Sequence, residues 1–180
     1  MDSIAQGRFD EARHELRVAE AASEVDQARG ALFAAAALAF ACVTEQYDDR
    51  PRLEASTRAR FGALPHALGG CIGEMFIAQL HGRAGDLDRA RAQLAIVRAH
   101  QVFASIEEPA WLALLTEACC LAGDRALAER LYAKLSPRAQ QFAFLGPLTM
   151  CPEPPYSRQL GLLAHALDRI ETAEIGRAHV

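Results

Sequence analysis

The sequence has few aromatic residues and few of the β-branched residues that favour strands. Aromatic side chains make up 7% of the 180 residues, and there is a single tryptophan. Alanine and leucine are abundant instead, which is typical of helices packed on helices. We therefore expect an all-α protein, and a chain of this length can bury the hydrophobic core of one ordinary domain.

The chain also lacks an excess of basic residues and a long apolar run. Its formal net charge of −4 provides no field that would attract nucleic acid or an anionic membrane. The longest apolar run, GALFAAAALAFACV from Gly30 to Val43, is shorter than the roughly 20 residues of a bilayer-spanning helix. No basic segment followed by an apolar stretch opens the sequence, so we expect a cytoplasmic protein with neither nucleic acid nor membrane as a direct partner.

Signatures of catalysis and of cofactor binding are missing as well. The sequence contains no GxxxxGK[ST], GxSxG or HExxH motif. The glycines of LGGCIGE, residues 68–74, lack the strand and helix that flank a phosphate loop, which favours close helix approach or a local break. We predict no catalytic residue, metal or cofactor. The five cysteines show no CxxC pairing, and we expect them to be small core residues: Cys42, Cys71, Cys119, Cys120 and Cys151.

A short motif recurs along the chain instead. Its copies are GRFDEAR from Gly7, GDLDRAR from Gly85, GDRALAE from Gly123 and the weaker DRIETAE from Asp168. Glycine tolerates the left-handed backbone that ends a helix, and aspartate can cap the next helix. The alanine five places after the first residue is small enough for two helices to approach closely; these alanines are Ala12, Ala90, Ala128 and Ala173. The motif predicts helical hairpin turns, with a possible fifth near Asp48.

Helix-length segments lie between these turns. We expect helices at residues 7–25, 27–47, 51–64, 66–84, 86–105, 108–122, 124–136, 138–146, 155–167 and from about 169. Trp111 belongs to an apolar stripe in EPAWLALLTEACCLA, residues 108–122, and we predict that it anchors the core. The predicted turns are 41, 37, 38 and 45 residues apart, against about 34 in a tetratricopeptide repeat. The pattern predicts a degenerate, tetratricopeptide-like α-solenoid of antiparallel hairpins.

Two stretches carry a family resemblance. EEPAWLALLTEACCLAGDRALAERLYAKLSP, residues 107–137, and YSRQLGLLAHALDRIETAE, residues 156–174, resemble the tetratricopeptide-like region of large bacterial multidomain regulators. In those regulators a signal-transduction P-loop ATPase is joined to a nucleotide cyclase or a LuxR-type DNA-binding domain. Arg158 and Gln159 stand where the family commonly has an aromatic, and Asp168 replaces a glycine. The resemblance implies a scaffold or sensing arm whose ATPase and output domains lie outside this chain.

The last six residues have a different character. Residues 1–174 are expected to form the repeat array as part of a longer solenoid, whereas Ile-Gly-Arg-Ala-His-Val at 175–180 is also encoded by the sequencing-adapter DNA ATCGGAAGAGCACACGTC. Our hypothesis is that this tail is adapter read-through; the alternative is a natural frayed end. Reads from an authentic genomic contig distinguish the two.

Binding is a better functional hypothesis than catalysis. Stacked hairpins form a concave groove along the first helix of each pair, here 27–47, 66–84, 108–122 and 155–167. Four polar residues on these helices are candidates for contact with a ligand in the groove: Glu74, His81, Glu117 and Arg158. The alternative for each is that it lies on an ordinary solvated helix face. We expect a non-catalytic interaction or sensing module inside a multidomain regulator. A free-standing adaptor for a protein partner is the alternative, and an enzyme on a helical barrel comes third.

Overall fold

A computed structural model describes residues 6–22, 27–64, 67–100, 109–141 and 156–169, and within these ranges all regular structure is helical. The elements are α2 (Phe9–Ala22), α3 (Gln27–Thr44), α4 (Arg50–Gly62), α5 (Ala67–Arg83), α6 (Leu87–Ala99), α7 (Pro109–Ala122), α8 (Arg125–Leu135), the 3₁₀ turn η2 (Ser136–Arg138) and α9 (Tyr156–Ala166). The prediction of an all-α protein is confirmed for this part of the chain. None of the described helices is both long and apolar enough to cross a bilayer.

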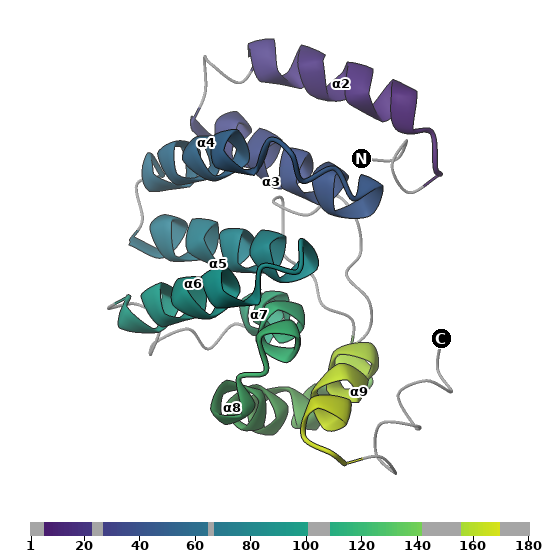
Figure 1. Ribbon diagram of the computed structural model, residues 1–180, viewed down its shortest axis with the longest axis vertical. Helices are drawn as coiled ribbons and strands as arrows, with labels where there is room; N and C mark the ends of the chain where they lie inside the picture. The colour runs from purple at the N-terminus through teal and green to yellow at the C-terminus, as the bar shows by residue number, and fades with distance from the viewer. Residues whose placement is uncertain (1–5, 23–26, 65–66, 101–108, 142–155, 170–180) are drawn as a thin grey trace.

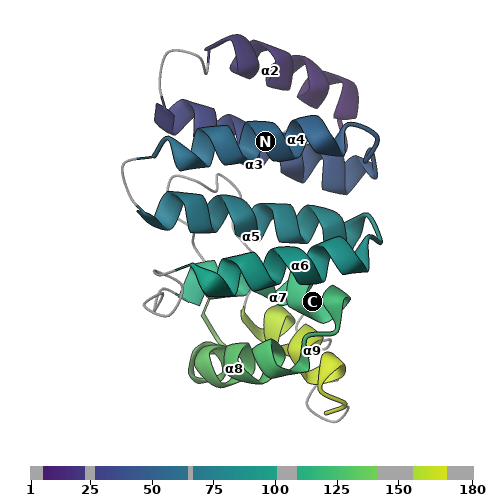
Figure 2. The ribbon, with the colours of Figure 1, turned by 60° about the vertical axis from the view of Figure 1, so that its left-hand side comes forward.

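The helices are stacked in chain order along the long axis of the molecule (Figure 1). The odd-numbered helices form one layer, in which α3 contacts α5, α5 contacts α7 and α7 contacts α9. The even-numbered helices form a second layer, in which α4, α6 and α8 each pack between the odd helix before them and the odd helix after them. Figure 2 shows the same order from a second side, with α2 at one end and α8 and α9 at the other. We call these the odd-helix layer and the even-helix layer.

The turns that join odd to even helices share one backbone geometry. Gly85 and Gly123 have positive φ angles of 77° and 69°, the left-handed conformation that glycine adopts without steric cost. The amide that follows each glycine donates to the carbonyl five residues back, from Asp86 to His81 at 3.0 Å and from Asp124 to Cys119 at 3.1 Å. This closes the helix as in a Schellman motif.

The same geometry occurs where glycine is absent. Glu45 has a φ of 55° and Asp168 a φ of 61°, and the following amides bond to Ala41 and Ala164 five residues back. The turn after α3 therefore lies at Glu45, which corrects the predicted position near Asp48. Together with Gly7, whose φ is 72°, the positive-φ residues are separated by 38, 40, 38 and 45 positions. The spacing is more even than the sequence motif alone indicates.

The predicted helices 86–105 and 138–146 differ from the structure. The predicted helix 86–105 ends at Ala99, and His100 has extended backbone with φ −66° and ψ 127°. At the predicted helix 138–146, Pro137 lies in the 3₁₀ turn η2, and residues 139–141 form a turn and a bend. Proline cannot donate the backbone hydrogen bond that would continue α8. Residues 101–105 and 142–146 lie outside the described residues.

Small residues let the helices approach closely. Ala12, Ala90 and Ala128 of the repeated motif are all buried at 0–1% exposure. Gly69 and Gly73 of the LGGCIGE segment lie against Phe61 of α4, so this segment serves close helix approach. The Trp111 side chain and Ala173 lie outside what the structure describes, and their predicted roles stay predictions.

The core is continuous from α3 to α9 through Phe76. A large cluster of buried side chains joins α5, α6, α7, α8 and α9, and two smaller clusters join α3, α4 and α5. Phe76 of α5 packs against all three clusters, and its ring centroid lies 5.5 Å from that of Phe61. Each helix therefore relies on its neighbours in the stack for its apolar cover.

Candidate protein-binding face

The odd-helix layer carries a polar cluster built on α5 and α7. Glu117 of α7 accepts a hydrogen bond from Gln79 at 2.9 Å and pairs with the Arg83 guanidinium at 2.7 Å. Burial opposes the charge of Arg83, but the hydrogen bond and charge of Glu117 more than offset it and raise the pKa of Arg83. The Glu117 and Arg83 side chains remain 26% and 32% exposed. The pair is thus fixed in place and still open to a ligand.

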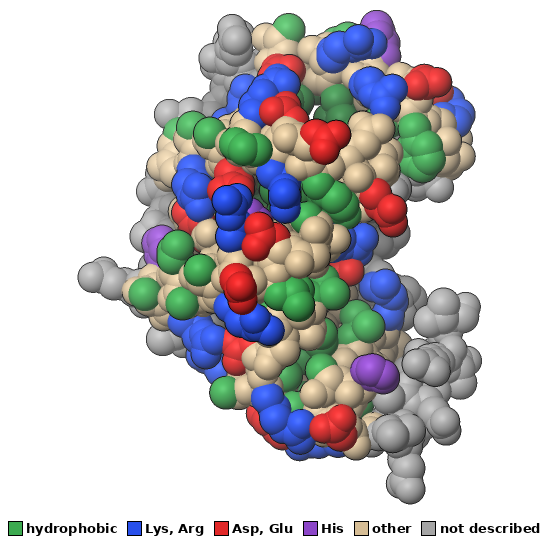
Figure 3. Space-filling view, in the orientation of Figure 1, with side chains coloured by type: hydrophobic (Ala, Val, Ile, Leu, Met, Phe, Trp, Pro, Cys, Tyr) green, Lys and Arg blue, Asp and Glu red, His purple; other side chains and the backbone are tan. Residues whose placement is uncertain are grey.

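Less polar side chains lie beside this pair. Cys42 and Tyr47 are close enough to Arg83 and Glu117 for their charges to act on them, and the Tyr47 hydroxyl donates to the Cys42 carbonyl at 3.3 Å. Leu121 of α7 is an exposed large hydrophobic residue. Figure 3 shows hydrophobic side chains, with charged ones among them, on the hollowed side of the molecule between α3 and α9. This mixture of apolar and fixed charged groups suits a protein ligand.

Of the four predicted groove residues, the structure places Glu117 in this cluster. Arg158 is exposed on α9. His81 and Glu74 are in a different place, because they belong to the seam where α5 meets α4 and α6. His81 is only 2% exposed, so its position differs from the ligand-facing one expected from the sequence. The sequence correctly placed these four residues on odd-numbered helices. It did not determine which side of its helix each residue occupies.

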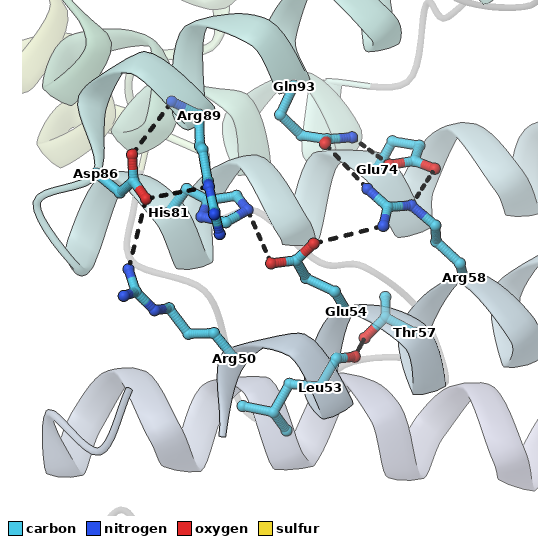
Figure 4. A network of polar contacts seen from close by, with 10 residues as sticks. All are labelled: Arg50, Leu53, Glu54, Thr57, Arg58, Glu74, His81, Asp86, Arg89 and Gln93. Atoms are coloured by element: carbon cyan, nitrogen blue, oxygen red, sulfur yellow. Dashed lines mark hydrogen bonds and ion pairs between the residues drawn. The ribbon is translucent and has the colours of Figure 1, made fainter. Parts of the chain in front are cut away.

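The seam contains a network of polar contacts (Figure 4). His81 Nε2 lies 3.0 Å from Glu54 Oε1. Arg58 donates to Glu54 of the same helix at 3.4 Å. It also bridges α4 to α5 and α6 by donating to Glu74 at 3.1 Å and to Gln93 at 3.2 Å. Gln93 also donates to Glu74. Each side chain of this network has at least one polar partner, and these contacts hold the two successive hairpins in register.

A second set of contacts extends this network toward the turn after α5. Asp86 caps α6 by accepting from the Arg89 amide at 3.3 Å. Its carboxylate also lies 3.8 Å from Arg50 and 3.4 Å from the Arg89 side chain. Asp86 thus caps the start of α6 and also links α6 to α4 through its ion pair with Arg50. We call the whole set, together with His81 and its partners, the α4–α6 seam.

Of the described cysteines, Cys71 and Cys119 are buried in the core, whereas Cys42 and Cys120 are partly buried. Burial raises the pKa of Cys42, Cys71 and Cys120 to about 11 and that of Cys119 to about 12. At neutral pH such thiols are protonated and weakly nucleophilic. No group of three or more His, Cys, Asp or Glu side chains within the described residues is placed to hold a metal ion. Cys151 lies outside those residues.

Several residues of both clusters were not found from the sequence. Gln79 and Arg83 were missed because they have no motif of their own, although each follows at helical spacing from Phe76 on α5. Arg58 and Gln93 were missed because their partners lie on other helices, at separations of 16 and 35 residues. Only the stacking order reveals such pairs.

Comparisons of the chain with protein-family models, with curated proteins and with solved structures found no match.

Proposed function

We propose that the chain is a non-catalytic, tetratricopeptide-like α-solenoid that binds protein through its odd-helix layer. The observation that carries this proposal is the packing pattern. Odd helices touch one another along the stack, and even helices fill the positions between them. In helical-hairpin arrays the more closely spaced layer lines the concave binding surface.

The chemistry of the odd-helix layer supports a protein ligand. The Arg83–Glu117 pair offers a bidentate donor and a carboxylate acceptor in fixed positions. Such a pair can exchange hydrogen bonds with a peptide backbone or with polar side chains. Apolar groups beside it provide the area that a protein interface requires. The site thus has the mixed character of an interaction surface.

The biological setting we propose is the cytoplasmic interior of a bacterial multidomain regulator. Support comes from the resemblance of residues 107–137 and 156–174 to the repeat region of such regulators, in which the array relays signals to an ATPase and an output domain. A free-standing adaptor is the alternative. Reading the genomic locus distinguishes them, since an in-frame P-loop ATPase supports the regulator and stop codons on both sides support the adaptor.

Binding through the odd-helix layer is tested by substitution. Arg83→Ala combined with Glu117→Ala should abolish cross-linking to the ATPase domain co-expressed with this chain. Lys134→Ala, at an exposed position of α8 in the even-helix layer, serves as the matched control and should cross-link normally. If all variants cross-linked equally, the odd-helix layer would not be the binding surface. Turnover of nucleotide by the isolated chain would contradict the non-catalytic role.

A further inference from the structure

His81 is buried in the α4–α6 seam with one ring nitrogen unpaired. Nε2 lies beside the Glu54 carboxylate at 3.0 Å, so the proton of the neutral ring belongs on Nε2. Nδ1 is buried and has no hydrogen-bond partner among the described residues. A bare lone pair there is tolerable, but a proton on Nδ1 would be a buried donor without an acceptor. The geometry favours neutral His81.

The charges around His81 are balanced only while the ring is neutral. The seam joins three arginines and three carboxylates through ion pairs. These are Arg50, Glu54 and Arg58 of α4, Glu74 of α5, and Asp86 and Arg89 at the start of α6. Protonated His81 would leave one positive charge in excess, on a residue that is only 2% exposed.

Among the described residues, the remaining neighbours of α5 offer no further compensation. Glu117 of α7 is already paired with Arg83, which lies two positions from His81 and therefore on the opposite side of the helix. The residues that α3 buries in its contacts with α4 and α5 are apolar, for example Ala34 and Leu38. Burial lowers the pKa of His81, and the opposing effect of Glu54 does not restore it to the ordinary value.

We propose that His81 is a pH-sensitive latch between the α3–α4 hairpin and the α5–α6 hairpin, closed when the imidazole is neutral and loosened when it is protonated. This regulation concerns the shape of the stack and does not depend on which partner the odd-helix layer binds. Because the folded chain binds the proton less readily than the unfolded chain, the stability due to neutral His81 is complete above about pH 6.5. It is lost as the pH falls below that value.

The first test is an NMR titration of the wild-type chain. The Cε1–H resonance of His81 should titrate at a lower pH in the folded chain than in the urea-unfolded chain. Amide exchange, corrected for its intrinsic pH dependence, should speed up in α4 and α5 before it does so in α8 when the sample is acidified. A His81 midpoint equal to or above that of the unfolded chain would overturn the latch, and so would uniform exchange along the stack.

The second test compares His81→Gln with wild type by urea unfolding at about pH 7.5 and about pH 5.5. Glutamine can still donate to Glu54 but does not titrate. His165→Gln, at an exposed position of α9, is the matched control. Acidification should raise the unfolding constants of wild type and His165→Gln by the same factor and that of His81→Gln by a smaller factor. An equal rise in all three would overturn the proposal. Should His81→Gln not fold, the wild-type titration decides.

Discussion

Gly69 of α5 lies so close to Phe61 of α4 that a Cβ built on the glycine would be 2.6 Å from the Phe61 carbonyl oxygen. The neighbouring atom belongs to the backbone, so the contact cannot be relieved by turning a side chain. Gly73, one turn further along, would place its Cβ 2.9 Å from the Phe61 Cβ. The distance between α4 and α5 is thus set by two glycines that face one phenylalanine.

Gly69→Ala should destabilise the protein. Overpacking of this kind costs about 1–3 kcal/mol, which outweighs the gain in helix propensity of about 1 kcal/mol. Urea unfolding followed by circular dichroism measures the change. Gly62→Ala is the control, because a Cβ there would have nothing within 4 Å and should leave stability unchanged or slightly raised. If both alanines had the same effect, the close approach of α4 and α5 would not be a constraint.

Glu45→Gly should stabilise the protein. Glu45 has a φ of 55°, a conformation that costs an ordinary residue about 1 kcal/mol more than glycine. The midpoint of urea unfolding should rise accordingly. Glu45→Ala keeps the strain while removing the carboxylate, so it should give no increase. A rise for alanine equal to that for glycine would assign the effect to charge rather than to the backbone.

Asp124→Ala should destabilise the protein by about 1–2 kcal/mol through loss of the cap of α8. The Asp124 carboxylate accepts from the Leu127 amide at 3.1 Å and also pairs with Arg98. Asp124→Asn retains the cap and loses only the charge, so it should cost less. Asp88→Ala, at a side chain that is 97% exposed, should change the free energy of unfolding by less than about 0.5 kcal/mol. If Asp124→Asn and Asp124→Ala lowered the free energy of unfolding equally, the capping role would be disproved.

The native thiols should react slowly with a disulfide reagent at neutral pH. Burial raises the pKa values of the described cysteines to about 11 or 12, so their reactive thiolate form is scarce. The measurement uses Cys151→Ser, which removes the cysteine outside the described residues. Four thiols should become reactive only when urea unfolds this variant. A thiol that reacts rapidly in the native state would reopen a catalytic or redox role.

The sequence predicted the helical class and the glycine turns because both depend on local properties. Gly85 and Gly123 mark their turns by residue type, and the backbone adopts the left-handed conformation there. The turn at Glu45 was missed because the surrounding structure imposes that conformation on a residue that does not favour it. The predicted turn between α3 and α4, near Asp48, was therefore three residues too late in the chain.

The polar clusters were less predictable, since they depend on the order in which helices stack. Glu117 was identified from its place on an odd helix, but its partner Arg83 is 34 residues away. His81 was assigned to the same face and instead lies buried beside Glu54. A helix in this stack has neighbours on several sides, and amphipathic spacing alone does not tell which side meets solvent.

The packing order has a consequence for synthesis on the ribosome. Substantial contacts among the described helices join only those one or two places apart in the chain. Contacts of such short range form quickly, and each hairpin can dock as soon as it emerges, without waiting for distant parts of the polypeptide. The nascent protein can therefore gain its structure progressively from the amino end.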